Sequence, residues 1–226
     1  MQYSIKHAAT PPALAGRWDD APWQGAETGS LANFFERSSD HRPKVEFRLL
    51  WDRAGLYVFF RVEDRYVRCL RTDYQNQVCK DSCVEFFVEP KPGMGYLNFE
   101  VNCGGNLLLY YLDYPDPAKG GIKMKEVVPR ALGETVKIYH SMPKVVYPEL
   151  DFDVTWKIEY FAPFSLFEHY FGPLGVIGGQ TWRANFYKCA DESSHPHWAT
   201  WAPLPPKVSF HVPQHFAPIR FLPAGA

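Results

Sequence analysis

Two runs of alternating apolar and polar residues, separated by a turn, constrain the fold of this chain most. Residues 83–89 read CVEFFVE and residues 97–102 read LNFEVN, with the breaker-rich segment 90–95 between them. Successive residues of a β-strand face opposite sides of a sheet, so each run buries an apolar row and presents a second row that carries polar groups. Glu85 and Glu100 belong to these second rows, and burying such groups without partners or water is costly. The sequence therefore predicts two adjacent strands with a candidate binding surface on one face.

Similar alternating runs recur along the rest of the chain. Segments rich in proline, glycine and polar residues lie between many of these runs, which cover residues 44–52, 56–64, 106–114, 134–141, 154–163 and 181–190. Only residues 164–170 suggest a helix, and it would be one short turn. Many short strands bounded by turn residues are typical of antiparallel sandwiches. We therefore expect an all-β fold, an antiparallel β-sandwich or jelly roll with at most short helical turns, formed by a single domain over residues 1–226.

Composition and charge exclude several classes of protein. Hydrophobic residues make up 46% of the chain, which is ample for a core and is not typical of a disordered chain. The 24 basic and 25 acidic residues give a net charge of −1, so the chain lacks the basic surface of a nucleic-acid binder. No apolar run is as long as a membrane span, and the N-terminal residues lack the apolar core of a signal peptide. The protein is then cytoplasmic, or extracellular or periplasmic if a signal peptide was removed, and its oligomeric state is left open.

The five cysteines are widely spaced along the chain. They are Cys69, Cys79, Cys83, Cys103 and Cys189. A zinc site typically draws on paired ligands at short spacing, and the pair at positions 79 and 83 has no second pair downstream. We therefore predict buried free thiols with at most one disulfide.

Polar residues on several predicted strands, together with nearby aromatic residues, indicate a binding site. Each of these strands carries charged or amide groups on one face, namely Arg61, Glu85, Asn98, Glu100, Asn102, Arg183 and Asn185. Such groups can equally form a solvated face of weak cross-strand ion pairs. Tyr74, Trp198 and Trp201 lie in predicted loops next to them. Aromatic faces that pack on a sugar ring, with amides and charges that hydrogen-bond its hydroxyls, can hold a carbohydrate without a deep pocket.

The order and spacing of several segments carry a resemblance to a known family. They are GRWDDAPWQGA (residues 16–26), LLWDRAGLYVFFRVED (49–64), KDSCVEFFVEP (80–90), YLNFEVNCGG (96–105), WKIEYFAPFS (156–165), GQTWRANFYKC (179–189), WATWAP (198–203) and FHVPQHFAPIRF (210–221). Together they resemble family 9 of the carbohydrate-binding modules, in particular its stand-alone members. The resemblance implies a β-sandwich that binds oligo- or polysaccharides without catalysis, holding terminal sugar residues between two aromatic side chains above charged and amide groups.

Position by position, the resemblance is uneven. It implies that Glu85 contacts the sugar and that Trp201, or Trp198 in its place, is one aromatic of the clamp. The other aromatic is expected just before Asp81, where residues 78–80 read VCK, and Tyr74 is the candidate substitute. A basic residue is expected where this chain has Glu100.

Two alternative functions compete with sugar binding. Glu85 and Glu100 on adjacent strands could serve as the acid and base of a glycosidase. The second alternative is a haem-binding relative of the same sandwich, for which His195 and His197 are a conspicuous pair.

No cofactor is expected, although some members of the family that the chain resembles bind structural calcium through loop carboxylates. The candidate calcium ligands in this chain are Asp113, Asp116, Asp151 and Asp153, which lack a diagnostic spacing.

Overall fold

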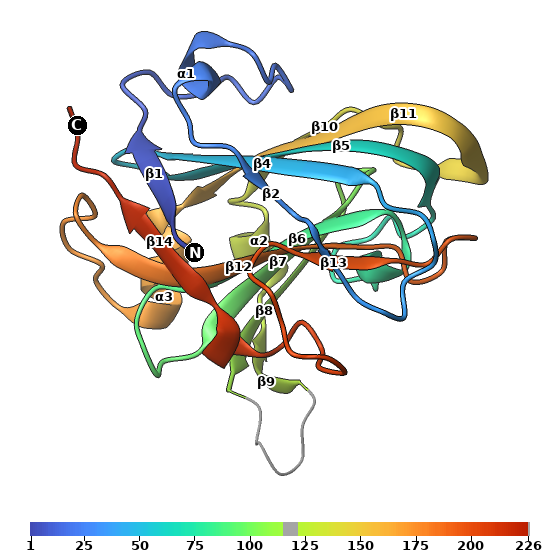
Figure 1. Cartoon of the computed structure of the whole chain (residues 1–226). Coiled ribbons are helices and arrows are strands. Elements are labelled where there is room, and N and C mark those ends of the chain that lie inside the picture. The colour runs from blue at the N-terminus through green and yellow to red at the C-terminus, as the bar shows by residue number, and fades with distance from the viewer. Residues whose placement is uncertain (115–121, 226) are drawn as a thin grey trace.

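The alternating runs form the long strands of a two-layered β-sandwich, which confirms the predicted fold class (Figure 1). The computed structural model describes residues 1–114 and 122–225. Its strands are β1 (Tyr3–His7), β2 (Gly29–Ser30), β3 (Asn33–Phe34), β4 (Lys44–Trp51), β5 (Gly55–Cys69), β6 (Cys83–Glu89), β7 (Tyr96–Asn102), β8 (Leu107–Asp113), β9 (Lys123–Val127), β10 (Lys137–His140), β11 (Val146–Pro163), β12 (Thr181–Cys189), β13 (Trp198–Thr200) and β14 (Ala217–Phe221). The α-helices are α1 (Ala21–Gln24), α2 (Arg130–Gly133) and α3 (Phe164–Phe171), and the 3₁₀ turns are η1 (Val78–Lys80) and η2 (Pro213–His215).

The two layers are joined through the first strand. We call the layer β14-β12-β6-β7-β8-β9 sheet A; in it β13 pairs with β12, and β3 pairs with β13. We call the layer β10-β11-β5-β4, with β2 beside β4, sheet B. β1 pairs in parallel with β4 and with β14, and so connects the two sheets at one side. The other neighbouring strands pair antiparallel, and short turns join β4 to β5, β6 to β7 and β7 to β8.

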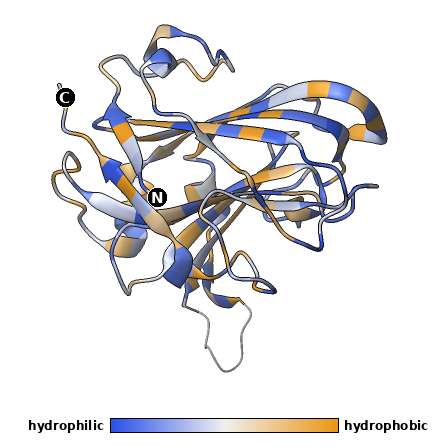
Figure 2. Cartoon of the chain, in the orientation of Figure 1, coloured by the Kyte–Doolittle hydropathy of each residue, from blue (hydrophilic) through white to orange (hydrophobic). Residues whose placement is uncertain are grey.

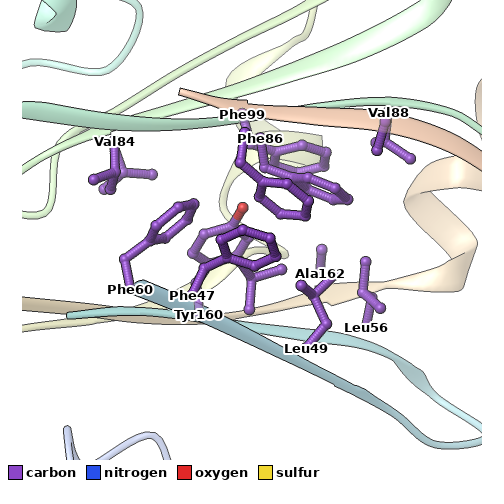
Figure 3. Packing of buried hydrophobic residues seen from close by; sticks show 14 of the residues in the cluster. Phe47, Leu49, Leu56, Phe60, Val84, Phe86, Val88, Phe99, Tyr160 and Ala162 are labelled. Atoms are coloured by element: carbon purple, nitrogen blue, oxygen red, sulfur yellow. The ribbon is translucent and has the colours of Figure 1, made fainter. Parts of the chain in front are cut away.

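The main core lies between the two sheets. Sheet A contributes Phe86 and Phe99, and sheet B contributes Phe47 and Phe60, whose rings point toward one another (Figure 3). Phe186 of β12 stacks on Phe47 with ring centroids 3.8 Å apart. The strand ribbons alternate between apolar and polar residues in Figure 2, as expected when one face of each strand is turned into this core.

The outer face of sheet A, which points away from the main core, is also largely covered. A second cluster of buried residues lies there, and it includes Val78 of the η1 turn and Phe210 and Phe216 of the C-terminal segment. Residues 70–81 and 203–216 therefore pack over this face, and the polar row of β6 and β7 is buried rather than open to water.

The outer face of sheet B is covered by the N-terminal segment. Trp18 and Trp23 contact Phe59 there, with ring centroids 5.0 and 5.2 Å away. The N-terminal segment therefore lies along the outside of the sandwich.

Two boundaries differ from those predicted. β5 continues to Cys69, so the loop expected from residue 65 begins later, because β11 supplies pairing partners as far as Val146. β11 likewise begins eight residues earlier than the predicted run, at Val146. None of the helices in the described part of the chain is long and apolar enough to cross a membrane.

Candidate functional site

The outer face of sheet A brings together side chains from four strands in cross-strand rows. In one row Tyr187 of β12, Glu85 of β6 and Glu100 of β7 are direct neighbours. The adjacent row places Cys189 beside Cys83. Since residues paired across antiparallel strands share a face, both rows point away from the main core. We call the group around the two glutamates the glutamate site.

The two carboxyl groups of the glutamate site are almost fully buried and are not ion-paired. Glu85 is 3% exposed and Glu100 is 6% exposed. The Glu85 carboxylate accepts a hydrogen bond from the Cys189 thiol at 3.0 Å, and Glu100 accepts one from the Asn98 side-chain amide at 2.7 Å. Among the described residues, neither glutamate forms a salt bridge, and Arg61 and Arg183 pair with Glu46 and Glu89 instead. Two buried acids without a counter-ion are poorly explained as a purely structural feature.

Burial governs the protonation of these acids. Loss of hydration raises the pKa of Glu100 to about 8, and both burial and the neighbouring Glu100 raise the pKa of Glu85 well above its usual range. A protonated carboxyl group can donate one hydrogen bond and still accept others. At neutral pH the site can therefore both donate to and accept from a hydroxyl group.

Partly exposed residues form the margin of the glutamate site. Cys79, Tyr110 and Trp198 all pack against the buried cluster on this face. The Trp198 indole donates a hydrogen bond to Asp191 at 2.7 Å, and burial raises the pKa of Asp191. Arg37 stacks on the Trp198 ring, with its guanidinium carbon 4.7 Å from the ring centroid. Trp198 therefore presents an aromatic face that already accommodates a polar, planar group.

A groove of about 660 Å³ adjoins this margin. Phe34, Phe35, Arg37, Leu204 and Pro205 are among the residues that line it. Phe35 and Leu204 also pack against the cluster that surrounds the glutamates. Arg37 lines the groove and stacks on Trp198, so the groove adjoins the margin of the glutamate site.

Three of the residues predicted for the site lie elsewhere. Arg61 is on sheet B, where it pairs with Glu46 and lies near Trp18. Tyr74 donates its hydroxyl proton to the carbonyl of Val128 at 2.7 Å and packs against the main core. Trp201 is 5% exposed and is itself part of that core. Tyr74 and Trp201 therefore do not lie at the glutamate site, where they were expected. Of the three predicted aromatic residues, Trp198 lies near Glu85 and Glu100.

The other predicted polar residues do share the outer face of sheet A, but their hydrogen bonds hold loops. Asn102 bonds to Asp81, to Asn106 and to the carbonyl of Arg71. Asn185 bonds to both backbone groups of Ala202. Arg183 lies 3.7 Å from Glu89 and donates to the carbonyls of Gln214 and Phe216. These three residues position the covering segments over the site.

Sequence reasoning missed several members of the glutamate site. Tyr110 joins the site only through the β7–β8 register. Asp191 and Cys189 reach the site only through the pairing of β12 with β6, which links positions about a hundred residues apart. Cys79 lies where the resemblance expects an aromatic, and it borders the site as that resemblance implies.

Several of the residues considered for haem or calcium binding contact other side chains of the protein. His197 is buried and contacts the Lys188 ammonium at 2.7 Å, while His195 stacks on Tyr66 with ring centroids 3.6 Å apart. All five cysteines are free thiols, and Cys79 alone is only half-buried. Of the calcium candidates, Asp113 pairs with Lys123 and Asp151 pairs with Arg65, Asp153 lines a surface pocket beside His41, and Asp116 lies outside the described residues.

Glu100→Gln is expected to make the protein more stable than wild type at pH 8, with a difference that vanishes toward pH 4.5. The folded-state pKa of Glu100 is raised to about 8, so its contribution to stability is complete below the unfolded value and is lost as pH rises through 8. The wild-type free energy of unfolding should then fall relative to the variant by at most about 1.4 kcal/mol per pH unit. Urea denaturation at several pH values measures this difference. Exposed Glu134 provides the control Glu134→Gln, and parallel curves for Glu100→Gln and wild type would contradict the assignment.

Comparison with solved structures supports the fold. A candidate carbohydrate-binding protein from Bacteroides uniformis ATCC 8492 is 25% identical, with a TM-score of 0.82 and a match over 97% of this chain and 98% of that chain. A family 9 carbohydrate-binding module from Caldicellulosiruptor kristjanssonii, solved with cellotriose and with glucose, is 14% identical. Its two structures give TM-scores of 0.64 and 0.62 and cover 99% of this chain and 94% and 96% of their own.

The sequence itself decides the assignment. Comparison with curated proteins gives no match. The sequence model described as carbohydrate-binding family 9 matches residues 26–221, which is most of the chain, and confirms the resemblance inferred from the motifs. The protein therefore belongs to carbohydrate-binding family 9.

Proposed function

We propose that the glutamate site binds a sugar residue at the end of an oligo- or polysaccharide, without catalysis. The observation that carries the proposal is the pair of buried, unpaired carboxyl groups, Glu85 and Glu100, beside the partly exposed ring of Trp198. Sugar hydroxyls both donate and accept hydrogen bonds, which matches what these acids and Asn98 can offer. Family membership supports the same ligand class.

Trp198 supplies the aromatic surface in this proposal. A pyranose ring that packs on an indole face gains apolar contact while its hydroxyl groups remain free for hydrogen bonds. Arg37 now lies on this ring, so the sugar either uses the opposite face or replaces the guanidinium group. A longer chain would continue toward the groove between Phe35 and Leu204, which adjoins the same margin.

Glucose and cello-oligosaccharides are the first ligands to test, because the family 9 module from Caldicellulosiruptor kristjanssonii was solved with glucose and with cellotriose. Trp198→Ala should weaken binding at least tenfold, which corresponds to about 1.4 kcal/mol, the size expected of an aromatic hot spot. Isothermal titration calorimetry with these sugars, after a broader glycan array, measures the change.

A matched control separates stacking from a general loss of aromatic surface. Phe152 of β11 is 58% exposed and lies on sheet B, so Phe152→Ala should leave the affinity unchanged. Glu85→Gln should also weaken binding, since it changes the hydrogen-bonding group next to Glu100. Equal affinities for Trp198→Ala and wild type, or no binding across the glycan panel, would overturn the proposal.

A further inference from the structure

A group of three donor atoms overlaps the glutamate site and shares Glu85 with it. Cys83 on β6 and Cys189 on β12 are direct cross-strand partners, and Glu85 follows Cys83 by two residues on the same face. The two sulfur atoms and a carboxylate oxygen of Glu85 all lie within 4.8 Å of one another. All three side chains are at least 97% buried. Three donors held by two paired strands form a fixed constellation rather than a chance encounter of mobile side chains.

The surroundings of these donors are mainly acidic. Asp191 and Glu100 lie close enough for their charges to act on Glu85, and the Cys79 thiol borders the same region. The Lys188 charge also acts on Glu85 and Cys83, but its side chain lies on the opposite side of sheet A, where it contacts Asp64 and His197. No described residue forms a salt bridge with Glu85 or Asp191. A buried acid with acidic neighbours and no ion pair favours binding of a cation.

We propose that Cys83, Cys189 and Glu85 bind a zinc ion. Two thiolates and one carboxylate are a donor set that suits zinc, which prefers sulfur, nitrogen and carboxylate ligands in a tetrahedral arrangement. Zn–S bonds of about 2.3 Å place two tetrahedral thiolates roughly 3.8 Å apart, so the observed group needs only small side-chain movements. Cys79 is the nearest further thiol and the candidate for a fourth ligand.

Binding requires the donors to lose their protons. Burial raises the pKa of Cys83 to about 12 and raises that of Cys189 well above its usual range. The zinc ion therefore displaces the two thiol protons, and any proton held by Glu85, into the solvent, and three negative ligands face its two positive charges. Because protons compete with the metal, the apparent affinity should rise with pH.

The experiment measures zinc bound by the whole chain under a thiol-free reductant. Elemental analysis after equilibrium dialysis should give one zinc per wild-type chain and less than a tenth of that for Cys83→Ser and Cys189→Ser. Cadmium in place of zinc should give thiolate charge-transfer absorption that both variants lose. Calorimetry in two buffers of different ionisation enthalpy should show release of at least two protons per zinc.

Matched controls keep the test decisive. Cys69 and Cys103 form a second pair of neighbouring thiols away from the site, and Cys69→Ser should retain a full equivalent of zinc. Glu85→Gln provides a variant that keeps both thiols and should weaken zinc binding at least tenfold. Trp198→Ala should keep zinc, so failure of the zinc site and failure of sugar binding are distinguishable. Wild type without stoichiometric zinc, equal loss in Cys69→Ser, or a stable Cys83–Cys189 disulfide that excludes the metal would each overturn the proposal.

Discussion

Trp201→Ala is expected to lower the free energy of unfolding by about 3–5 kcal/mol, the range for removing a buried large aromatic side chain. Trp201 is 5% exposed, and its ring lies edge-on to Phe47 and Phe186, with centroids 5.8 and 5.6 Å away. Alanine would leave a cavity between the two sheets that the surrounding rings fill only in part. Chemical denaturation followed by circular dichroism measures the loss.

Trp198→Ala is the matched comparison, since the two tryptophans are three residues apart. Trp198 is only partly buried and lies on the outer face of sheet A, so its removal should cost clearly less stability than that of Trp201. The two substitutions should separate further in binding, because sugar affinity is expected to depend on Trp198. A stability loss for Trp201→Ala no larger than that for Trp198→Ala would contradict the placement of Trp201 in the core.

Parity along the strand explains how this distinction could have been drawn from the sequence. Residues at an odd separation in extended chain face opposite sides of a sheet. Trp198 and Trp201 are separated by three positions, so in an extended chain they face opposite sides. Trp198 is the cross-strand partner of Cys189 and shares its face, so Trp201 is expected to face the other way. The same rule correctly grouped Glu100 with Asn102 on β7 and Arg183 with Asn185 on β12, since each strand's alternation is a local property.

Which strands become neighbours is not a local property, so the alternation patterns could not predict it. Arg61 has the same alternation as Glu85, yet β5 and β6 belong to different sheets. The contact between Cys189 and Glu85 depends on the register of β12 against β6, which long-range packing of the two sheets sets. Burial of the polar row by residues 70–81 and 203–216 follows from loops that carry no periodic signal. Alternation therefore predicted the strands and their faces, and tertiary pairing determined the site.

Alternation also placed Lys188 in the apolar row of β12, where it forms part of a buried charged cluster between the two sheets. Lys188 and Asp64 have fully buried side chains, with Nζ and Oδ2 3.6 Å apart. Asp64 also bonds to His41 at 2.7 Å and accepts from the Trp156 indole at 3.1 Å. Burial alone would raise the pKa of Asp64, but Lys188 and His41 together hold it below its ordinary range. Burial lowers the pKa of His197 to about 3, so this histidine is neutral beside the ammonium group at neutral pH.

Asp64→Asn is expected to lower the free energy of unfolding at pH 7 by about 3–5 kcal/mol, the range for breaking a buried ion pair by removing one partner. The substitution keeps the size of the side chain but leaves the Lys188 ammonium buried without a carboxylate, near the neutral His197 ring, the Trp156 ring and the carbonyl of Cys189. Urea denaturation at pH 7 measures the effect. The neighbouring Glu63 is half-exposed and pairs with Lys44 at the surface, so Glu63→Gln should produce no resolvable change.

A double-mutant cycle tests whether the effect of Asp64→Asn arises from the lost charge pair. Lys188→Met removes the ammonium group and should itself be destabilising, because it leaves the Asp64 carboxylate without its lysine partner. The double variant carries neither charge, so its loss should be smaller than the sum of the two single losses by at least about 1 kcal/mol. Additive losses would show that Asp64 stabilises the fold through His41 and Trp156 instead. A loss for Asp64→Asn equal to that for Glu63→Gln would show that the buried pair does not stabilise the fold. The coupling energy therefore measures how strongly this charge pair ties sheet A to sheet B beneath the glutamate site.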